Sequence, residues 1–247
     1  MISLIKADLL RILNKRSFQI VLAVTAALVL ALVIPDRLKY WNGFVYAVNR
    51  INALTTTIPV IIGIASFMGI YADEFQSKSL QAAIGRGMPR RRLILSKIIV
   101  CSILTAIVFV AFFVFFVLLG LILGAHMSPE DVKILALATV SGAYIVICCT
   151  PLAAILLYAT DNTALSVFAE LLLISVIPLA LEMMGSMPLI HNFHLDSLYV
   201  TGFANGFFAD MMLTGGGFLR LLVGAVLYLG LAYLLSWLVF RKKELEL

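Results

Sequence analysis

The chain has 247 residues, of which 63% are hydrophobic and 13% are charged, and its formal net charge is +5. A soluble domain carries about 45–50% apolar and about 25% charged residues, so this composition excludes an ordinary soluble domain and predicts a lipid bilayer as partner. Nucleic acid is not an expected partner, because the sequence has neither a basic soluble domain nor an interleaved aromatic stripe. The basic surplus suits the anionic surface of a membrane.

Residues 1–17 are predicted to form an amphipathic helix that lies in the membrane surface. One helical face is apolar, and most of the remaining positions are charged. The apolar residues are Ile2, Ile5, Leu9, Ile12 and Leu13, and the charged residues are Lys6, Asp8, Arg11, Lys15 and Arg16. An apolar face opposite a basic face is typical of helices at a lipid interface. The alternative is an unstructured basic flank that acts only as a topology signal.

Six apolar runs follow, and each is long enough, or nearly so, to cross a hydrocarbon core of about 30 Å as a helix. They cover about residues 18–34, 53–71, 98–124, 134–159, 164–181 and 218–240. Only helices or a closed barrel can span lipid, since every backbone group there must be hydrogen-bonded within the protein. Continuous runs without strict alternation exclude the barrel. The sequence therefore predicts an all-α polytopic membrane protein with six transmembrane helices in one domain, residues 1–247.

Residues 73–97, between the second and third runs, form a long polar interval that is strongly basic. The basic residues are Lys78, Arg86, Arg90, Arg91, Arg92 and Lys97, against the acidic Asp73 and Glu74. Apolar residues recur at roughly helical spacing, at Leu80, Ala83, Ile84, Met88 and Leu93. We expect a short surface helix and a cationic turn that bind a partner. The alternative is a basic loop that only orients the protein in the membrane.

The placement of Lys and Arg predicts the orientation of the spans. With the N-terminus inside, 13 of the 18 Lys and Arg residues fall on the inner side. The outer ones are Arg37, Lys39, Arg50, Lys133 and Arg220. Because basic residues are enriched in cytoplasmic loops, both termini and residues 73–97 are expected in the cytoplasm.

Glu170 lies in the fifth predicted span, about two turns from its inner end. A carboxylate there is costly, so we expect it to face the bundle interior, a partner or water. Two roles stay open, a contact with substrate or a proton, and a purely structural one. No metal site is expected from the remaining candidate ligands, which are Cys101, Cys148, Cys149, His126, His191 and His194.

The outer segment 182–217 precedes the last span. Its apolar middle, residues 198–213, is too short to cross the membrane, and we expect it to be broken at Gly202 and Gly206. Such a segment is typical of a re-entrant or interfacial hairpin. The alternative is an ordinary surface loop.

No enzyme site is predicted. The sequence holds no GxxxxGK[ST] phosphate loop, no HExxH motif and no GxSxG motif. We expect no cofactor or metal on the chain itself, so energy for any transport must come from a partner or an ion gradient.

This layout resembles the permease subunit of type-2 bacterial ABC exporters, and it is similar to lantibiotic-immunity and bacitracin-resistance permeases. In that family an acidic residue ends the second span, a Gly-x-Ser-Arg-like turn follows, and a Lys opens the third span. The matching residues are Glu74, then Gly87-Met88-Pro89-Arg90, then Lys97. Lys78-Ser79 stands where the family has a Gly-Thr pair.

The resemblance implies partners and a site. Two permeases, identical or similar siblings, would form the transmembrane part in a bacterial cell membrane. Separate ABC ATPase subunits would hold ATP and Mg and dock on the first cytoplasmic loop. Their closure would move an amphipathic substrate, for example an antimicrobial peptide, outward. The residues that the resemblance assigns to ATPase coupling are Glu74, Leu80, Ala83, Ile84, Gly87, Arg90, Arg91, Arg92 and Lys97, and Glu170 is the candidate on the translocation path.

Two other functions stay open at this point. The protein could be an ion-gradient-driven transporter with Glu170 as the proton carrier. It could also be a non-transporting membrane anchor that holds a soluble partner through residues 73–97. An adjacent reading frame with a phosphate loop would favour the ABC exporter over both.

Overall fold

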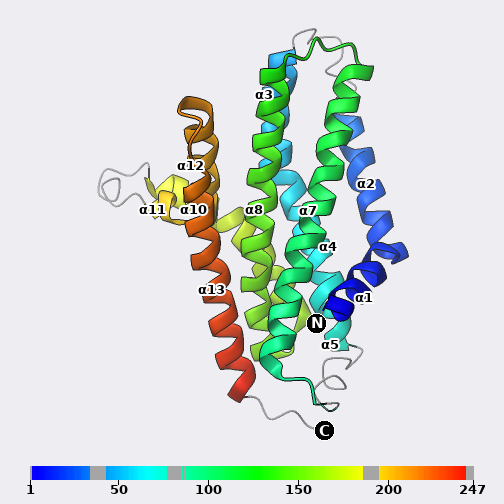
Figure 1. The fold of residues 1–247 in the computed structure, drawn as a ribbon, viewed down its shortest axis with the longest axis vertical. Coiled ribbons are helices and arrows are strands. Elements are labelled where there is room, and N and C mark those ends of the chain that lie inside the picture. The colour runs from blue at the N-terminus through cyan, green and yellow to red at the C-terminus, as the bar shows by residue number, and fades with distance from the viewer. Residues whose placement is uncertain (1, 34–42, 77–84, 86, 186–194, 243–247) are drawn as a thin grey trace.

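The computed structural model describes residues 2–33, 43–76, 85, 87–185 and 195–242, and the secondary structure of these ranges is helical, without strands (Figure 1). The α-helices are α1 Ile2–Leu13, α2 Arg16–Val33, α3 Gly43–Asn52, α4 Ile58–Phe67, α5 Asp73–Gln76, α7 Arg90–Ile122, α8 Pro129–Thr160, α9 Thr163–Leu171, α10 Ile177–Gly185, α11 Leu195–Leu198, α12 Val200–Leu213 and α13 Phe218–Lys242. Three π-helical turns, η2 Ala53–Thr57, η3 Met68–Ala72 and η4 Leu172–Val176, join successive α-helices without a break.

Five helices in the described ranges are long and apolar enough to cross a membrane. They are Gly43–Phe75, Arg90–Ile122, Pro129–Thr160, Thr163–Met184 and Phe218–Arg241. A sixth results if Leu4–Leu13 and Arg16–Ala31, which meet at a bend of 57°, count as one span. The predicted fold class, an all-α polytopic membrane protein, is confirmed.

The helices extend beyond the predicted apolar runs at the second and third spans. Helix α3 begins ten residues before the second run, so Arg50, expected in an outer loop, is instead buried within a helix. Helix α7 begins at Arg90, directly after Pro89 in extended conformation. A hydropathy pattern marks only the apolar part of a helix, whereas the helix itself continues until a residue such as proline ends it.

Helix α8 is the central element of the bundle (Figure 1). It packs against α3, α4, α7, α9, α12 and α13, and its buried residues lie all around its circumference. A helix that is apolar on all sides is expected in the interior of a bundle. At Gly142 the backbone of η2 comes so close that a Cβ atom would lie 2.0 Å from the Leu54 carbonyl oxygen.

The segment before the last span contains helix α12, which forms a hairpin with α13, and the expected break at Gly202 and Gly206 is wrong. Helix α12 is continuous through both glycines and lies beside the first part of α13 (Figure 1). The glycines serve close packing instead. A Cβ at Gly202 would lie 2.0 Å from the Asp196 carbonyl oxygen, and one at Gly206 would lie 1.7 Å from Nη1 of Arg220.

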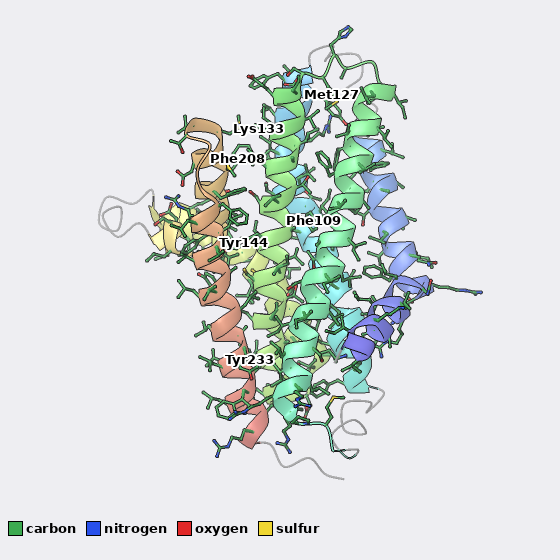
Figure 2. All side chains as sticks on the ribbon, viewed as in Figure 1. Phe109, Met127, Lys133, Tyr144, Phe208 and Tyr233 are labelled. Carbon is green, nitrogen blue, oxygen red and sulfur yellow. The ribbon has the colours of Figure 1, made fainter. Side chains whose placement is uncertain are left out.

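Aromatic side chains fill the space between α8, α12 and α13. Tyr144 of α8 is buried there, and Phe208 of α12 packs against the same cluster (Figure 2). Phe203 and Tyr228 meet edge to face, with their ring centroids 6.3 Å apart. This apolar contact holds the α12–α13 hairpin on the central helix.

Candidate functional site

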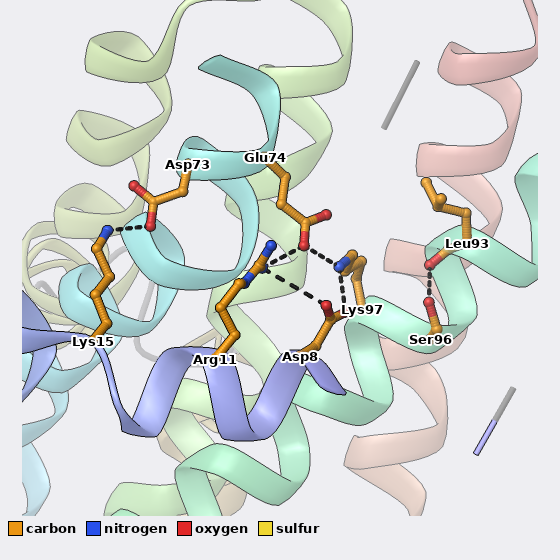
Figure 3. Close-up of polar contacts among 8 residues, drawn as sticks. All are labelled: Asp8, Arg11, Lys15, Asp73, Glu74, Leu93, Ser96 and Lys97. Carbon is orange, nitrogen blue, oxygen red and sulfur yellow. Dashed lines mark hydrogen bonds and ion pairs between the residues drawn. The ribbon is translucent and has the colours of Figure 1, made fainter. Parts of the chain in front are cut away.

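Helix α1, the end of the Gly43–Phe75 helix and the start of α7 meet in a buried cluster of charges (Figure 3). Lys97 is at its centre, and its side chain is 4% exposed. Its Nζ lies 2.5 Å from Oδ2 of Asp8 and 2.5 Å from Oε1 of Glu74. Both acidic residues are buried as well. One ammonium group therefore joins three segments that are far apart in the sequence.

Arg11 of α1, Lys15 between α1 and α2, and Asp73 complete this ionic cluster, which we define as Asp8, Arg11, Lys15, Asp73, Glu74 and Lys97. Arg11 places Nη2 2.5 Å from Oε1 of Glu74 and 3.8 Å from Oδ1 of Asp8. Lys15 binds Asp73. Three acidic and three basic side chains balance one another. Asp8, Glu74 and Lys97 are buried, and buried charges require such pairing, whereas Arg11, Lys15 and Asp73 are partly exposed to solvent.

A second set of contacts joins the start of α7 to the end of α13. Arg90 donates from Nη1 to the Phe240 carbonyl oxygen at 2.6 Å. Carbonyls in the last turn of a helix lack intrahelical donors, and a cation there also complements the helix dipole. The Arg91 guanidinium lies 4.4 Å from the ring centroid of Trp237. Helix α7 thus contacts α1 through Lys97 and α13 through Arg90 and Arg91.

Tyr158, near the end of α8, extends these contacts into the bundle. Its ring centroid lies 5.1 Å from that of Phe240, 5.8 Å from that of Phe75 and 6.3 Å from that of Tyr71. The rings connect α5, η3 and α13 through the central helix. Phe75 follows Glu74 in the chain, and the Phe240 carbonyl accepts the hydrogen bond from Arg90, so Tyr158 packs against neighbours of both sets of charged contacts.

Glu170 is fully buried in the bundle interior, between α9, α8 and α4. Thr150 of α8 donates a hydrogen bond to its Oε1 at 2.7 Å. Its Oε2 has no hydrogen-bond partner within the described ranges. Gly63 of α4 leaves room for the carboxyl group, since a Cβ there would lie 2.8 Å from Oε1.

The family model of the ABC-2 family transporter proteins matches residues 5–178 of the chain. This range holds the whole ionic cluster, Arg90, Arg91 and Glu170. The chain belongs to the ABC-2 transporter family. No curated protein matches the chain.

As an ABC-2 permease, the chain is the transmembrane component of an ABC transporter and is not itself catalytic. The family implies an ABC ATPase as partner and a multi-pass position in a membrane. Helices α11, α12 and α13 lie beyond the matched range.

The structure divides the residues that the sequence assigned to ATPase coupling. Glu74 and Lys97 pair with each other in the permease interior, while Arg90 and Arg91 contact α13. Arg92 is exposed. Gly87 has a positive φ of 87°, which favours glycine in the turn before α7. Leu80, Ala83 and Ile84, the expected coupling helix, lie outside the described residues.

Sequence reasoning missed the partners of these residues. The charges of α1 were expected to face water and lipid headgroups, but Asp8 is buried against Lys97. One signal was present, because an acidic residue is out of place on the basic face of an interfacial helix. The aromatic residues Trp237 and Phe240 gave no such signal, since both fit an ordinary membrane span.

Proposed function

We propose that this ABC-2 permease couples ATP hydrolysis on a separate ABC ATPase to the export or extraction of an amphipathic substrate. The coupling element is residues 73–97, in the cytoplasm of a bacterial cell together with both chain termini. ATP and Mg bind to the ATPase subunit, and the permease itself carries no cofactor. The observation that supports this proposal is the pairing of Glu74 with Lys97 at the two ends of the loop.

The ionic cluster gives the loop a rigid base. Because Lys97 binds both Glu74 and Asp8, a displacement of the loop moves the Gly43–Phe75 helix, α7 and α1 together. Arg90 adds α13 to this group. Buried charge pairs in low dielectric resist separation, so force applied to the loop is carried into the helices instead of being lost in local bending.

The ATPase contact itself is assigned to the outer part of the loop. Arg92 is exposed and can attract an acidic surface of the ATPase, which speeds association more than it adds affinity. Leu80, Ala83 and Ile84 supply the apolar contact. Glu74 and Lys97 act indirectly, as residues that position the loop.

Two permeases, identical or similar, pair around the substrate path. An antimicrobial peptide is the cargo that suits the resemblance to immunity and resistance permeases. Such peptides partition into the bilayer, where a permease with apolar outer faces can receive them. Exposed apolar residues on those faces include Ile20, Val24, Leu222 and Val226.

Co-purification with the cognate ATPase, followed by measurement of its ATPase rate, tests the proposal. Arg92→Ala is expected to weaken association, because its charge faces outward. Glu74→Gln is expected to keep association and reduce ATPase stimulation, because it loosens the base of the loop. Lys133→Ala, on an exposed position of α8, is the matched control. If both loop variants associate with the ATPase and stimulate its activity as the unmodified permease does, residues 73–97 do not couple the two subunits.

A further inference from the structure

A cavity of about 580 Å³ lies between η2, α8, η4, α10 and α12, away from the ionic cluster. Its residues Asn52 and Thr55 belong to the first half of the Gly43–Phe75 helix, whose other end carries Glu74. Two π-helical turns border it, η2 with Thr55 and η4 with Ser175. Single π-helical turns inside α-helices are frequent at functional sites, and the volume is in the range of small-ligand sites.

Four of the five hydroxyl groups that line this cavity use their hydrogens within the protein, namely those of Thr55, Thr56, Ser141 and Ser175. Thr55 donates to the Ile51 carbonyl oxygen at 2.9 Å, and Ser175 donates to that of Leu171 at 2.9 Å. Thr56 donates to Asn52, and Ser141 donates to Ala204 at 3.4 Å. A hydroxyl has a single hydrogen, so each of these groups can offer a ligand only its lone pairs. The cavity therefore offers these four hydroxyl oxygens as acceptors, while Thr201 and the side-chain amides of Asn52 and Asn205 can also donate.

Glu182 adds a carboxylate to the lining, and no lysine or arginine of the described ranges lines the cavity. A ligand with hydrogen-bond donors and a positive charge complements such a surface. Ile145, Ile174 and Phe208 supply apolar walls for the rest of the ligand. An anionic headgroup would lie against the Glu182 carboxylate, and no lysine or arginine in the part of the chain that the structure describes lines the cavity to balance the two negative charges.

We propose that this cavity binds the ammonium or guanidinium group of a cationic amphiphile, with Glu182 as its counter-ion. The inference rests on the proposed transport function only in naming the class of substrate. Binding itself requires the permease alone.

A matched pair of small probes tests the charge preference. The full chain in phosphatidylcholine nanodiscs is titrated with 4-phenylbutylamine and with 4-phenylbutanol by ligand-observed NMR, and empty nanodiscs serve as the blank. The amine is expected to bind more tightly than the alcohol. Glu182→Gln is expected to weaken amine binding roughly threefold and to leave the alcohol unchanged, because Glu182 is exposed and water screens an exposed ion pair. Glu130→Gln, at an exposed acidic residue outside the cavity, is expected to change neither.

A second experiment measures the rate at which a thiol in the cavity is modified, and it does not depend on equilibrium binding. The three native cysteines are buried, so Thr201→Cys introduces a reactive thiol at the cavity wall. An ammonium-bearing methanethiosulfonate is expected to react faster there than its sulfonate counterpart. Glu182→Gln in the same chain is expected to reduce, several-fold, the ratio of the ammonium reagent's reaction rate to that of the sulfonate reagent.

Equal affinity for amine and alcohol, or a reagent ratio that Glu182→Gln leaves unchanged, overturns the inference. Neither experiment contains an ATPase. Cation binding would therefore leave the cavity assigned even if the permease failed to stimulate its ATPase, which would contradict the coupling proposal alone. ATPase stimulation without cation binding would overturn the cavity assignment and leave the coupling proposal in place.

Discussion

Lys97 and Glu74 lie 23 positions apart in the sequence, yet Nζ of the lysine is 2.5 Å from Oε1 of the glutamate, and both side chains are buried. The two residues close the base of the loop that joins the second and third spans. The same Nζ also binds Asp8 of α1. Removing the ammonium group would leave two buried carboxylates facing each other, so Lys97 is the residue on which the cluster depends most.

Replacing Lys97 by methionine is expected to destabilise the permease strongly. Methionine keeps the length of the side chain but removes the buried cation that Asp8 and Glu74 share, so that the half-exposed Arg11 is, within the described ranges, the one cation still in contact with both. Loss of one partner from a buried ion pair costs about 3–5 kcal/mol. The melting temperature in one detergent should fall well below that of the Lys133→Met control, which alters an exposed lysine of α8. Equal melting temperatures would show that the cluster contributes nothing to stability.

Arg11→Met is expected to cost much less, below about 1 kcal/mol. Arg11 contacts the same carboxylate oxygen of Glu74 as Lys97 does, but its side chain is 47% exposed. Water and salt screen such a pair, and exposed pairs contribute little to stability. The melting temperatures of the Arg11→Met and Lys97→Met proteins, compared in low and high salt, check that the second substitution costs more stability. A loss for Arg11→Met as large as for Lys97→Met would contradict the burial argument.

The fold class could be predicted from the sequence because continuous apolar runs have only one structural solution in lipid. The ends of the helices could not. The run that begins near residue 98 carries no sign that α7 starts at Arg90, since an arginine in the first turn lowers hydropathy without ending a helix. Gly202 and Gly206 misled for a related reason. Glycine in a sequence indicates either a break in a helix or a close approach of another group. The close approach became evident only from the positions of Asp196 beside Gly202 and of Arg220 beside Gly206.

The ionic cluster depends on contacts over long sequence distances. Asp8 and Lys97 are 89 positions apart, and no local pattern pairs them. The motif of an acid, a turn and a lysine did mark Glu74 and Lys97 as important. Its interpretation as a set of partner-facing residues fits Arg92, which is exposed, better than it fits the two buried ends of the motif.

Arg90→Gln is expected to loosen the end of α13. The guanidinium donates to the Phe240 carbonyl oxygen at 2.6 Å, and its carbon lies 5.5 Å from the centroid of the Phe240 ring. Without it the last carbonyls of α13 lose a charged donor, worth about 1.5 kcal/mol or more. Hydrogen exchange of peptides from residues 236–242 should accelerate about tenfold, while Arg92→Gln should leave it unchanged. Identical exchange in the two variants would show that Arg90 does not hold α13.

Glu170→Gln is expected to keep ATPase-coupled transport. The glutamine oxygen can accept the Thr150 hydrogen bond as Oε1 of Glu170 does now, and the side chain keeps its shape against Gly63. If Glu170 has a structural role, the neutral isostere satisfies it, whereas a proton carrier needs an ionisable group. Transport by the permease with its cognate ATPase in vesicles, in the presence and absence of ATP, measures the difference. Gly63→Ala is the contrasting variant, since its methyl group would press on Oε1 and on Cδ1 of Ile174, and we expect a loss of about 1–3 kcal/mol in stability. Loss of transport in a stably folded Glu170→Gln protein would contradict a purely structural role. It would indicate that the carboxyl group of Glu170 takes part in translocation and would favour a proton step.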